Sequence, residues 1–279
     1  SLVIDDEINP NAQSALDGHK NPLPLPNLES NILCGNSLID EFEGTRLIKE
    51  SDLFGDSTYQ IDMNHSRFES IVRTLIEKQN ELFRCDNTEK KKQLKDEIES
   101  LRDMIILSQL EGCGSEKIQR YQESKQMASK PYVLWQLDFA RVFREKGGFD
   151  IVIGNPPYKL CQPSNTSEYY LEYYKNHFKV ASYKIDLFHL FFERGINLLK
   201  SKGVLGYITP NTYLTNKYIK PLRKYILDNC RIHKIINHDK VFDSASVDTA
   251  TIVMSKEIYE HNTISVLQSS NYIFTEVCK

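Results

Sequence analysis

The sequence lacks the features that mark membrane, secreted and zinc-binding proteins. Its 279 residues contain no apolar run near the ~20 residues that span a bilayer. Residues 1–6 have neither the basic start nor the long apolar core of a signal peptide. The six cysteines are scattered without paired spacing, which argues against a zinc site and is typical of a reduced chain. We therefore expect a cytoplasmic protein with no metal site and no membrane contact.

Basic charge is not in surplus either. With 35 Lys and Arg against 38 Asp and Glu, the net charge is −3, so global charge gives no sign of nucleic-acid binding. Any DNA contact has to come from a local basic face. The best one lies on the helix predicted over residues 217–229, which carries Lys217, Lys220, Arg223 and Lys224. Phosphate contact and a merely solvated face are both open interpretations of this helix.

What the chain does contain is a short apolar run, residues 151–153, bounded by glycines. Such a β-branched run predicts a buried strand in a parallel sheet. Gly154 then permits a sharp turn, and Pro156 and Pro157 remove two backbone donors and hold φ near −65°. The result is a rigid segment at the carboxyl end of a strand, where open α/β sheets bind ligands.

The chemistry of this segment follows from Asn155, Pro156, Pro157 and Tyr158. The side-chain carbonyl of Asn155 and the backbone carbonyl of Pro156 are two acceptors with fixed directions, which suit the two donors of a planar amino group. Drawing both hydrogens to one side exposes the nitrogen lone pair. Tyr158 adds an aromatic face on which a flat ring can stack. The pattern indicates an amino group on an aromatic ring as the substrate.

These four residues resemble motif IV, Asn-Pro-Pro-Tyr, of the gamma-type N6-adenine DNA methyltransferases. More narrowly, the chain resembles the methyltransferase part of type IIG restriction–modification enzymes. The resemblance implies an α/β fold, a partial Rossmann-like class I methyltransferase sheet that is mainly parallel. It also implies S-adenosyl-L-methionine as cofactor and methyl transfer to an adenine flipped out of double-stranded DNA. Asn155, Pro156, Pro157 and Tyr158 would be the catalytic residues.

Two further stretches carry the resemblance on the cofactor side. Residues 31–34 predict a short strand, and Asn36 after it is similar to a motif III position that approaches the cofactor adenine. The alternative is that Asn36 caps a turn or helix. Residues 185–200 predict a buried helix, similar to the family's motif V region. By that similarity Phe188 or Phe191 borders the cofactor, while a role in the core stays open for both.

Near the end, strands are predicted over residues 232–237 and 249–254, with a loop between them. This arrangement resembles the family's closing hairpin, motif VIII. The resemblance makes Phe242 the aromatic residue that packs on the flipped adenine, opposite Tyr158. His189, alone on its predicted helix, is interpreted as structural.

Residues 64–128 have a different pattern, with apolar positions at helical spacing in two runs. We predict a helical hairpin inserted into one partial methyltransferase domain that spans residues 1–279. It would brace a partner domain in the parent enzyme. A polar loop over residues 162–167 is expected to be mobile beside the site.

The family's glycine-rich cofactor loop has no counterpart in the sequence. We therefore expect a piece of a longer protein, without the upstream cofactor-loop segment and the downstream target-recognition domain, that does not methylate DNA alone. Methyltransferases acting on protein glutamine or RNA adenine remain alternatives, because an amide –NH₂ fits the same two acceptors. A non-catalytic scaffold of a phage-defence protein is a further alternative.

Overall fold

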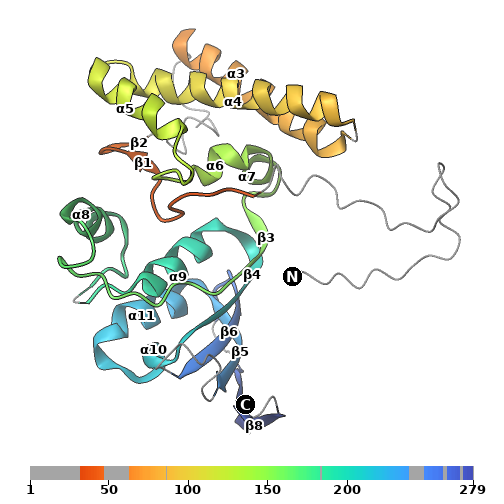
Figure 1. Cartoon of the computed structure of the whole chain (residues 1–279). Coiled ribbons are helices and arrows are strands. Elements are labelled where there is room, and N and C mark those ends of the chain that lie inside the picture. The colour runs from red at the N-terminus through yellow and green to blue at the C-terminus, as the bar shows by residue number, and fades with distance from the viewer. Residues whose placement is uncertain are drawn as a thin grey trace, which may run out of the picture.

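A six-stranded sheet built from the second half of the chain organises the fold (Figure 1). The computed structural model describes residues 32–46, 63–85, 87–182, 184–238, 248–259, 263–270 and 273–278. In these ranges the strand order is β3-β4-β6-β5-β7-β8. The strands are β3 (Phe149–Gly154), β4 (Leu199–Pro210), β5 (Arg231–His238), β6 (Thr249–Ser255), β7 (Ser265–Ser270) and β8 (Ile273–Cys278).

The strand directions are mixed. β3 pairs with β4 and β5 pairs with β7 in parallel, whereas β6 lies between β4 and β5 and is antiparallel to both. β8 is antiparallel to β7. The α/β class and the antiparallel pairing of the two late strands are confirmed. The prediction of a mainly parallel sheet holds for strand direction, since β3, β4, β5 and β7 of the described sheet run the same way and β6 and β8 run against them. The antiparallel pairs at β6 arise because this strand enters the sheet by a hairpin from β5 instead of a helical crossover.

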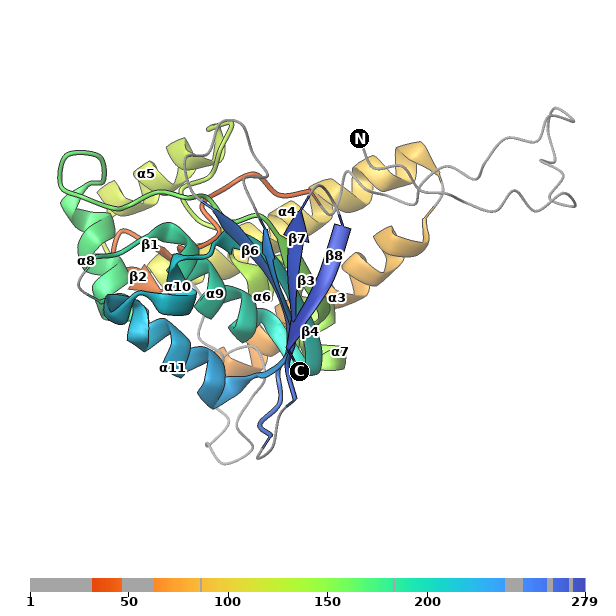
Figure 2. The same cartoon turned by 90° about the horizontal axis from the view of Figure 1, so that it is seen from below.

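One face of the sheet is covered by helices from the same half of the chain (Figures 1 and 2). The long one, α9, is apolar nearly all round, as the sequence predicts, and buries Phe192 and Ile196 among others. β4 turns Leu205 and Tyr207 to this core. The covering elements are α9 (Leu187–Leu198), α10 (Thr212–Thr215), the 3-10 turn η1 (Lys217–Ile219) and α11 (Lys220–Asn229).

The join between α9 and β4 is tighter than predicted. α9 ends at Leu198 and β4 begins at the next residue, where Leu199 pairs with Phe149 of β3. The helix predicted over residues 185–200 is therefore two residues too long at its carboxyl end. Gly203 lies inside the strand, where an added Cβ would be 2.8 Å from the Phe149 carbonyl oxygen. The missing side chain lets β4 lie close to β3 at this residue, and Gly203 does not end the helix.

β3 is parallel to its neighbour but is not buried. It lies at one end of the described sheet and pairs with β4 alone. Val152 packs on the core, while Ile151 and Ile153, on the other face, are 68% and 84% exposed. The prediction of a buried strand is therefore wrong. An apolar sequence favours burial, but it does not determine whether the strand lies in the middle or at the end of the sheet.

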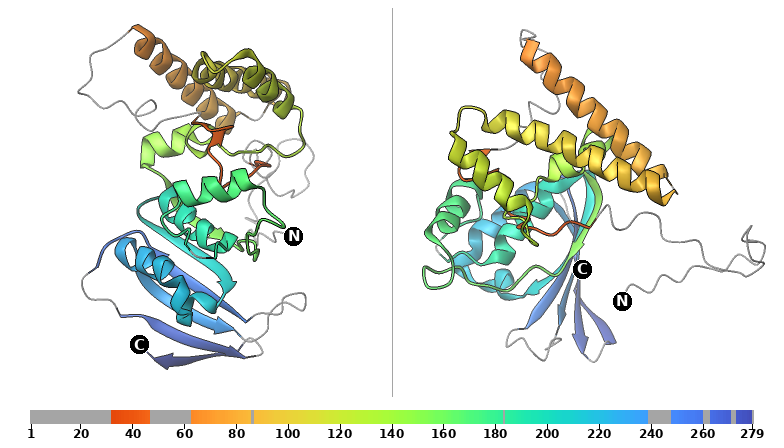
Figure 3. Two further views of the ribbon diagram at one scale, coloured as in Figure 1. Left: turned by 90° about the vertical axis from the view of Figure 1, so that its left-hand side faces the viewer. Right: turned by 45° about the horizontal axis from the view of Figure 1, so that its top comes forward.

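A second, mainly helical layer lies beside the sheet (Figure 3). It starts with the short hairpin strands β1 (Glu41–Phe42) and β2 (Thr45–Arg46). It continues with α3 (Met63–Arg84), α4 (Thr88–Leu110), α5 (Ser115–Lys125), α6 (Trp135–Asp138) and α7 (Ala140–Lys146). None of the helices in the described ranges is both long and apolar enough to cross a bilayer.

The predicted helical hairpin is present as α3 and α4. Asn87 caps α4, because its side chain accepts a hydrogen bond from the Lys90 backbone N–H at 3.0 Å. Ion pairs join the two helices, with Lys78 to Glu97 at 2.6 Å and Lys90 to Glu81 at 2.7 Å. The charge-rich stretch therefore forms a salt-bridged helix face, and a third helix, α5, follows the hairpin.

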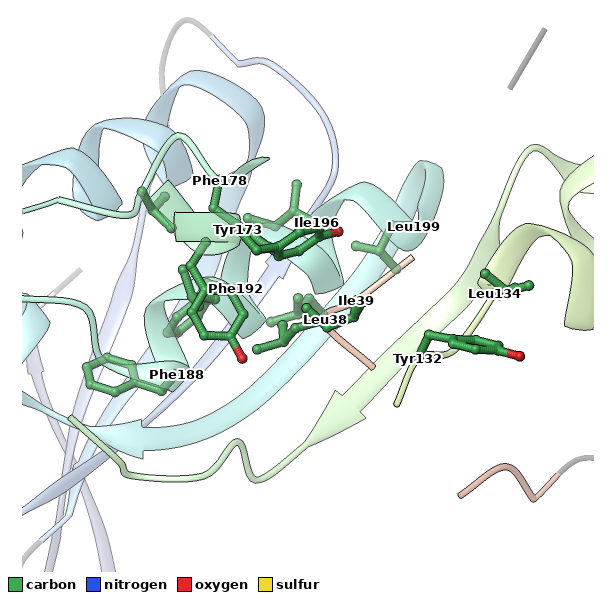
Figure 4. Packing of buried hydrophobic residues seen from close by; sticks show 14 of the residues in the cluster. Leu38, Ile39, Tyr132, Leu134, Tyr173, Phe178, Phe188, Phe192, Ile196 and Leu199 are labelled. Atoms are coloured by element: carbon green, nitrogen blue, oxygen red, sulfur yellow. The ribbon is translucent and has the colours of Figure 1, made fainter. Parts of the chain in front are cut away.

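The hairpin is fastened to the segment that leads into β3. Arg102 of α4 pairs with the buried Asp138 of α6 at 2.6 Å. Burial nevertheless raises the Asp138 pKa, against the opposing effect of Arg102. Gln79 of α3 donates to the Leu137 and Asp138 carbonyls at 3.1 and 3.2 Å. Hairpin side chains such as Leu75 and Ile105 join the same apolar cluster as the sheet side, part of which is shown in Figure 4.

Candidate functional site

The segment Asn155, Pro156, Pro157 and Tyr158 leaves the carboxyl end of β3 and runs past α9 toward α8 (Glu168–His177; Figure 1). Pro156 is buried and Tyr158 is half-buried, while Asn155 and Pro157 are exposed. The Asn155 side chain makes no hydrogen bond with any part of the chain that the structure describes. Its carbonyl oxygen is therefore available to an amino group from outside.

Tyr158 is attached to the neighbouring strand. Its hydroxyl donates to the backbone carbonyl of Ile208 in β4 at 3.4 Å, and burial raises its pKa. The phenol therefore stays neutral at physiological pH, and its role in the site is that of an aromatic surface. Gly154, the last residue of β3, is directly in register with Tyr207.

The role of Gly154 differs from the predicted one. It has no positive φ and continues the strand, so the prediction of a sharp turn at this residue is wrong. A Cβ at this position would be 3.2 Å from Cε1 of Tyr207. Its function is to admit the Tyr207 ring against the strand, which brings the acceptor segment close to β4.

The other end of the acceptor segment is held by Asp186, a residue that the sequence analysis did not single out. Its Oδ1 accepts from the Lys159 backbone N–H at 3.1 Å, and the Leu187 N–H donates to the Lys159 carbonyl at 3.0 Å. Burial raises the Asp186 pKa, although the backbone N–H groups around it, including that of Phe188, oppose the shift. An Asp directly before an apolar helix is the signal that could have identified it.

The polar loop after the acceptor segment is folded on itself. Asn165 donates to the Leu160 carbonyl at 3.0 Å and accepts from the Gln162 backbone N–H at 3.0 Å and from the Thr166 hydroxyl at 2.8 Å. Beyond it, Tyr173 and Tyr174 are buried in helix packing, while Tyr169 remains 41% exposed. The expectation of a mobile loop finds no support in this hydrogen-bonded turn.

Asn36 takes the geometry of a turn cap. Its Oδ1 accepts from the Leu38 backbone N–H at 3.2 Å, and its own backbone N–H donates to the Lys130 carbonyl at 3.0 Å. The strand predicted over residues 31–34 is wrong for its described part, because residues 32–34 form no strand and Gly35 makes an isolated bridge with Lys130. The Asn36 side chain is half-buried and its Oδ1 is used by the Leu38 N–H, so the capping alternative is realised.

Phe188 and Phe191 lie on α9 but differ in exposure. Phe188 is 2% exposed and packs edge-on against Phe192 and Tyr213, with ring centroids 6.4 Å apart in both pairs (Figure 4 shows Phe188 and Phe192). Phe191 is half-buried at the edge of the core. His189 is buried, and desolvation lowers its pKa to about 4. These contacts give Phe188 and His189 a structural role.

The loops at the carboxyl edge of the sheet meet beside the acceptor segment. The Asn211 backbone N–H, just after β4, donates to the Asp248 carbonyl, just before β6, at 3.0 Å. The Asn211 side chain donates to Asn237 of β5 at 3.0 Å, and Asn237 donates to Gln268 of β7 at 3.0 Å. Phe242, between β5 and β6 in the sequence, lies outside the described residues.

The described residues alone do not form a site for S-adenosylmethionine. Phe188 is enclosed in the core, and the Asn36 carbonyl oxygen is used in its turn. A cavity of about 500 Å³ lies beside Trp135, Tyr173 and Arg194. It is at the opposite end of β3 from Asn155, because Trp135 contacts Phe149, the first residue of that strand, at 6.1 Å between ring centroids. Asn36 and Phe191 contribute at most one wall of a cofactor site.

Comparison with known proteins places these observations in a family. The type II restriction enzyme and methyltransferase RM.Eco57I of Escherichia coli is 34% identical over 116 residues, which cover 40% of this chain and 12% of that protein. The type II methyltransferase M.BstVI of Geobacillus stearothermophilus is 24% identical over 253 residues, covering 88% of this chain and 42% of that protein. The chain thus spans less than half the length of these relatives.

Solved structures give a weaker likeness. The crystal structure of the type IIG restriction endonuclease BpuSI is 22% identical, with a TM-score of 0.36 over 43% of this chain and 15% of that chain. The profile of the Eco57I restriction-modification methylase family matches residues 56–242, about two-thirds of the chain, and includes the acceptor segment. The chain belongs to the Eco57I restriction-modification methylase family.

Proposed function

We propose that this chain carries the target-base site of an adenine-specific DNA N6-methyltransferase in a restriction–modification system. One observation carries the proposal: among the described residues the Asn155 amide has no hydrogen-bond partner. It stands at the end of a strand, and the next residues are a buried proline, an exposed proline and a half-buried tyrosine. Family membership supports methyl transfer as the reaction. The relatives RM.Eco57I and M.BstVI are named as methyltransferases, which supports methyl transfer as the reaction.

The chemistry assigned to the segment is recognition and activation of an exocyclic amino group. The Asn155 side-chain carbonyl and the Pro156 backbone carbonyl each accept one N–H, which turns the nitrogen lone pair away from the ring plane and toward the methyl donor. Tyr158, tied to Ile208, offers its ring for stacking on the base. Positioning and polarisation by these groups lower the barrier.

The position of the acceptors favours a base that has left the duplex. An adenine inside B-DNA cannot place its amino group between Asn155 and Pro156 at the end of a strand, so the base would be flipped. We propose Phe242, in the loop between β5 and β6, as the aromatic side chain on the other face of the adenine. S-adenosyl-L-methionine, when bound, supplies the electrophilic methyl group. In the whole protein we propose that Asn36 and Phe191 line its adenine end, jointly with parts outside the residues described.

The test is Asn155→Ala in the whole protein, assayed by transfer of labelled methyl groups to a DNA duplex and by mass spectrometry of the product nucleosides. Removing one of two fixed acceptors is expected to lower kcat by about 10²–10³-fold, as loss of one preorganised partner does in other sites. Asn165→Ala is the matched control, because the hydrogen bonds of this amide within the described residues all lie in its own loop. Near-normal turnover of Asn155→Ala, or methyl groups found on another acceptor than adenine N6, would contradict the proposal.

A further inference from the structure

The sequence from Arg194 to Leu227 contains no acidic residue and seven basic ones. This is unusual in a chain whose acidic residues outnumber its basic ones. The stretch covers the last turn of α9, β4, and the α10–η1–α11 segment that follows the carboxyl end of β4. Its charge is therefore local, and the structure decides which of the cations are available to a partner.

Three of these cations are engaged or lie elsewhere. Arg194 pairs with Asp40 at 3.4 Å, and Lys200 pairs with Asp150 at 2.5 Å. Lys202 is close to the amino-terminal end of β4, away from the acceptor segment. None of the three belongs to the edge of the sheet from which Asn155 emerges.

Two more cations are used inside the α10–α11 segment. The Arg223 guanidinium donates to the carbonyl oxygens of Tyr213 and Asn216, each at 2.7 Å. It therefore closes the turn between α10 and α11. Lys224 pairs with Asp228 one turn further along α11 at 2.7 Å. The basic helix face expected from the sequence is thus half occupied by internal contacts.

Lys217 and Lys220 remain. Both are exposed, and neither makes a hydrogen bond or ion pair with the residues that the structure describes. Between them Tyr218 is 58% exposed, with the Lys217 Nζ 5.1 Å from its ring centroid. The Asn216 side chain accepts from the Tyr218 backbone N–H at 2.9 Å, which fixes the turn that presents all three.

This turn lies at the same edge as the acceptor segment. Parallel pairing puts Gly154 opposite Tyr207, so β3 and β4 end side by side, and the hydroxyl of Tyr158 reaches Ile208. Only α10 separates the end of β4 from Lys217 (Figure 2 shows α10 beside α9). A duplex that delivers a base to Asn155 passes in front of this edge, and two exposed ammonium groups spaced i, i+3 can contact neighbouring phosphates.

We propose that Lys217, Tyr218 and Lys220 form a docking surface for the sugar–phosphate backbone of duplex DNA beside the acceptor segment. The proposal rests on the proposed function for the choice of DNA over other polyanions. The two lysines neutralise phosphates, and the Tyr218 ring packs on the sugar edge. Because these contacts carry no sequence information, they position the duplex and leave base selection to other groups.

The test is fluorescence anisotropy of a labelled 24-base-pair DNA duplex, titrated with the protein at several salt concentrations. Loss of two phosphate contacts is expected to reduce the salt slope by about 2 and to weaken binding by ~10-fold or more at 0.1 M salt. Lys217→Ala with Lys220→Ala is the test variant, and Lys217→Arg with Lys220→Arg should keep the slope. Lys91→Ala with Lys92→Ala on α4 removes the same charge far from this edge and should leave the slope unchanged.

Equal salt slopes for the double alanine variant and the wild type would overturn the proposal. So would absence of duplex binding by the wild type at 20 mM salt, or tighter binding of a matching RNA duplex. The docking surface and the acceptor site can be tested separately. If Asn155→Ala keeps its methyltransferase activity while the double alanine variant shows the reduced salt slope, the docking surface stands and the proposed acceptor site fails.

Discussion

Replacing His189 tests whether this histidine of α9 is a structural, neutral side chain. It is 6% exposed, and its Nε2 has no hydrogen-bond partner within the described part of the chain. The adjacent Phe188 ring packs edge-on against it at 4.2 Å between centroids. Burial lowers its pKa from 6.5 to about 4. The imidazole is therefore neutral in the folded protein at pH values where the unfolded chain already binds a proton.

The sign and size of the effect follow from linkage. Below about pH 6.5 the unfolded state takes up a proton that the folded state refuses until about pH 4, so stability is lost as the pH falls through this window. This lowering of the His189 pKa reduces the free energy of unfolding by about 3 kcal/mol at pH 4 relative to pH 7. His189→Leu keeps an apolar side chain of similar size in the core and removes this titration.

The assay is urea unfolding of wild type and His189→Leu at intervals between pH 4 and pH 7. The free energy of unfolding of the variant minus that of the wild type should increase by about 3 kcal/mol as the pH falls from 7 to 4. Other groups, such as the partly buried His238, whose pKa is also lowered by burial, titrate in both proteins and cancel in the difference. Parallel curves would refute the reasoning, because they would mean that His189 is protonated or solvated in the folded state.

Two further substitutions test the packing that holds the site. Gly195→Ala should destabilise the protein by about 1–3 kcal/mol, although Ala is the better helix former, because its Cβ would overlap the Tyr207 hydroxyl and approach Leu205 Cδ1 to 2.8 Å. Gly206→Ala, which meets nothing within 4 Å, should change the thermal midpoint little, and equal losses in both variants would contradict the packing argument. Asp186→Ala should cost about 1–2 kcal/mol and accelerate hydrogen exchange at residues 158–161, since a half-buried carboxylate that accepts a backbone N–H is removed. Unchanged exchange there would show that Asp186 does not anchor the acceptor segment.

The sequence was informative where local chemistry decides the structure. Alternating or helical spacing of apolar residues predicted α4, α9, β5 and β6. Each of these elements buries one face or its whole surface, and the spacing of its apolar residues shows which side is buried. The acceptor segment was visible for a similar reason, since two consecutive prolines after an asparagine restrict the backbone whatever surrounds them. Two of the four cations on the predicted basic helix proved to be engaged, which depends on partners that spacing does not reveal.

Taken alone, the sequence determined the type of α3, α4, α9, β3, β5 and β6, and the donors and acceptors available in the acceptor segment, residues 155–158. Tertiary structure decided what lies next to what. It put β3 at the end of the described sheet, so that Ile151 and Ile153 are exposed, and it made Gly154 a point of close approach for Tyr207. The physical reason is that propensity and hydrogen-bonding capacity are properties of a residue and its near neighbours, whereas burial and pairing depend on segments distant in the chain.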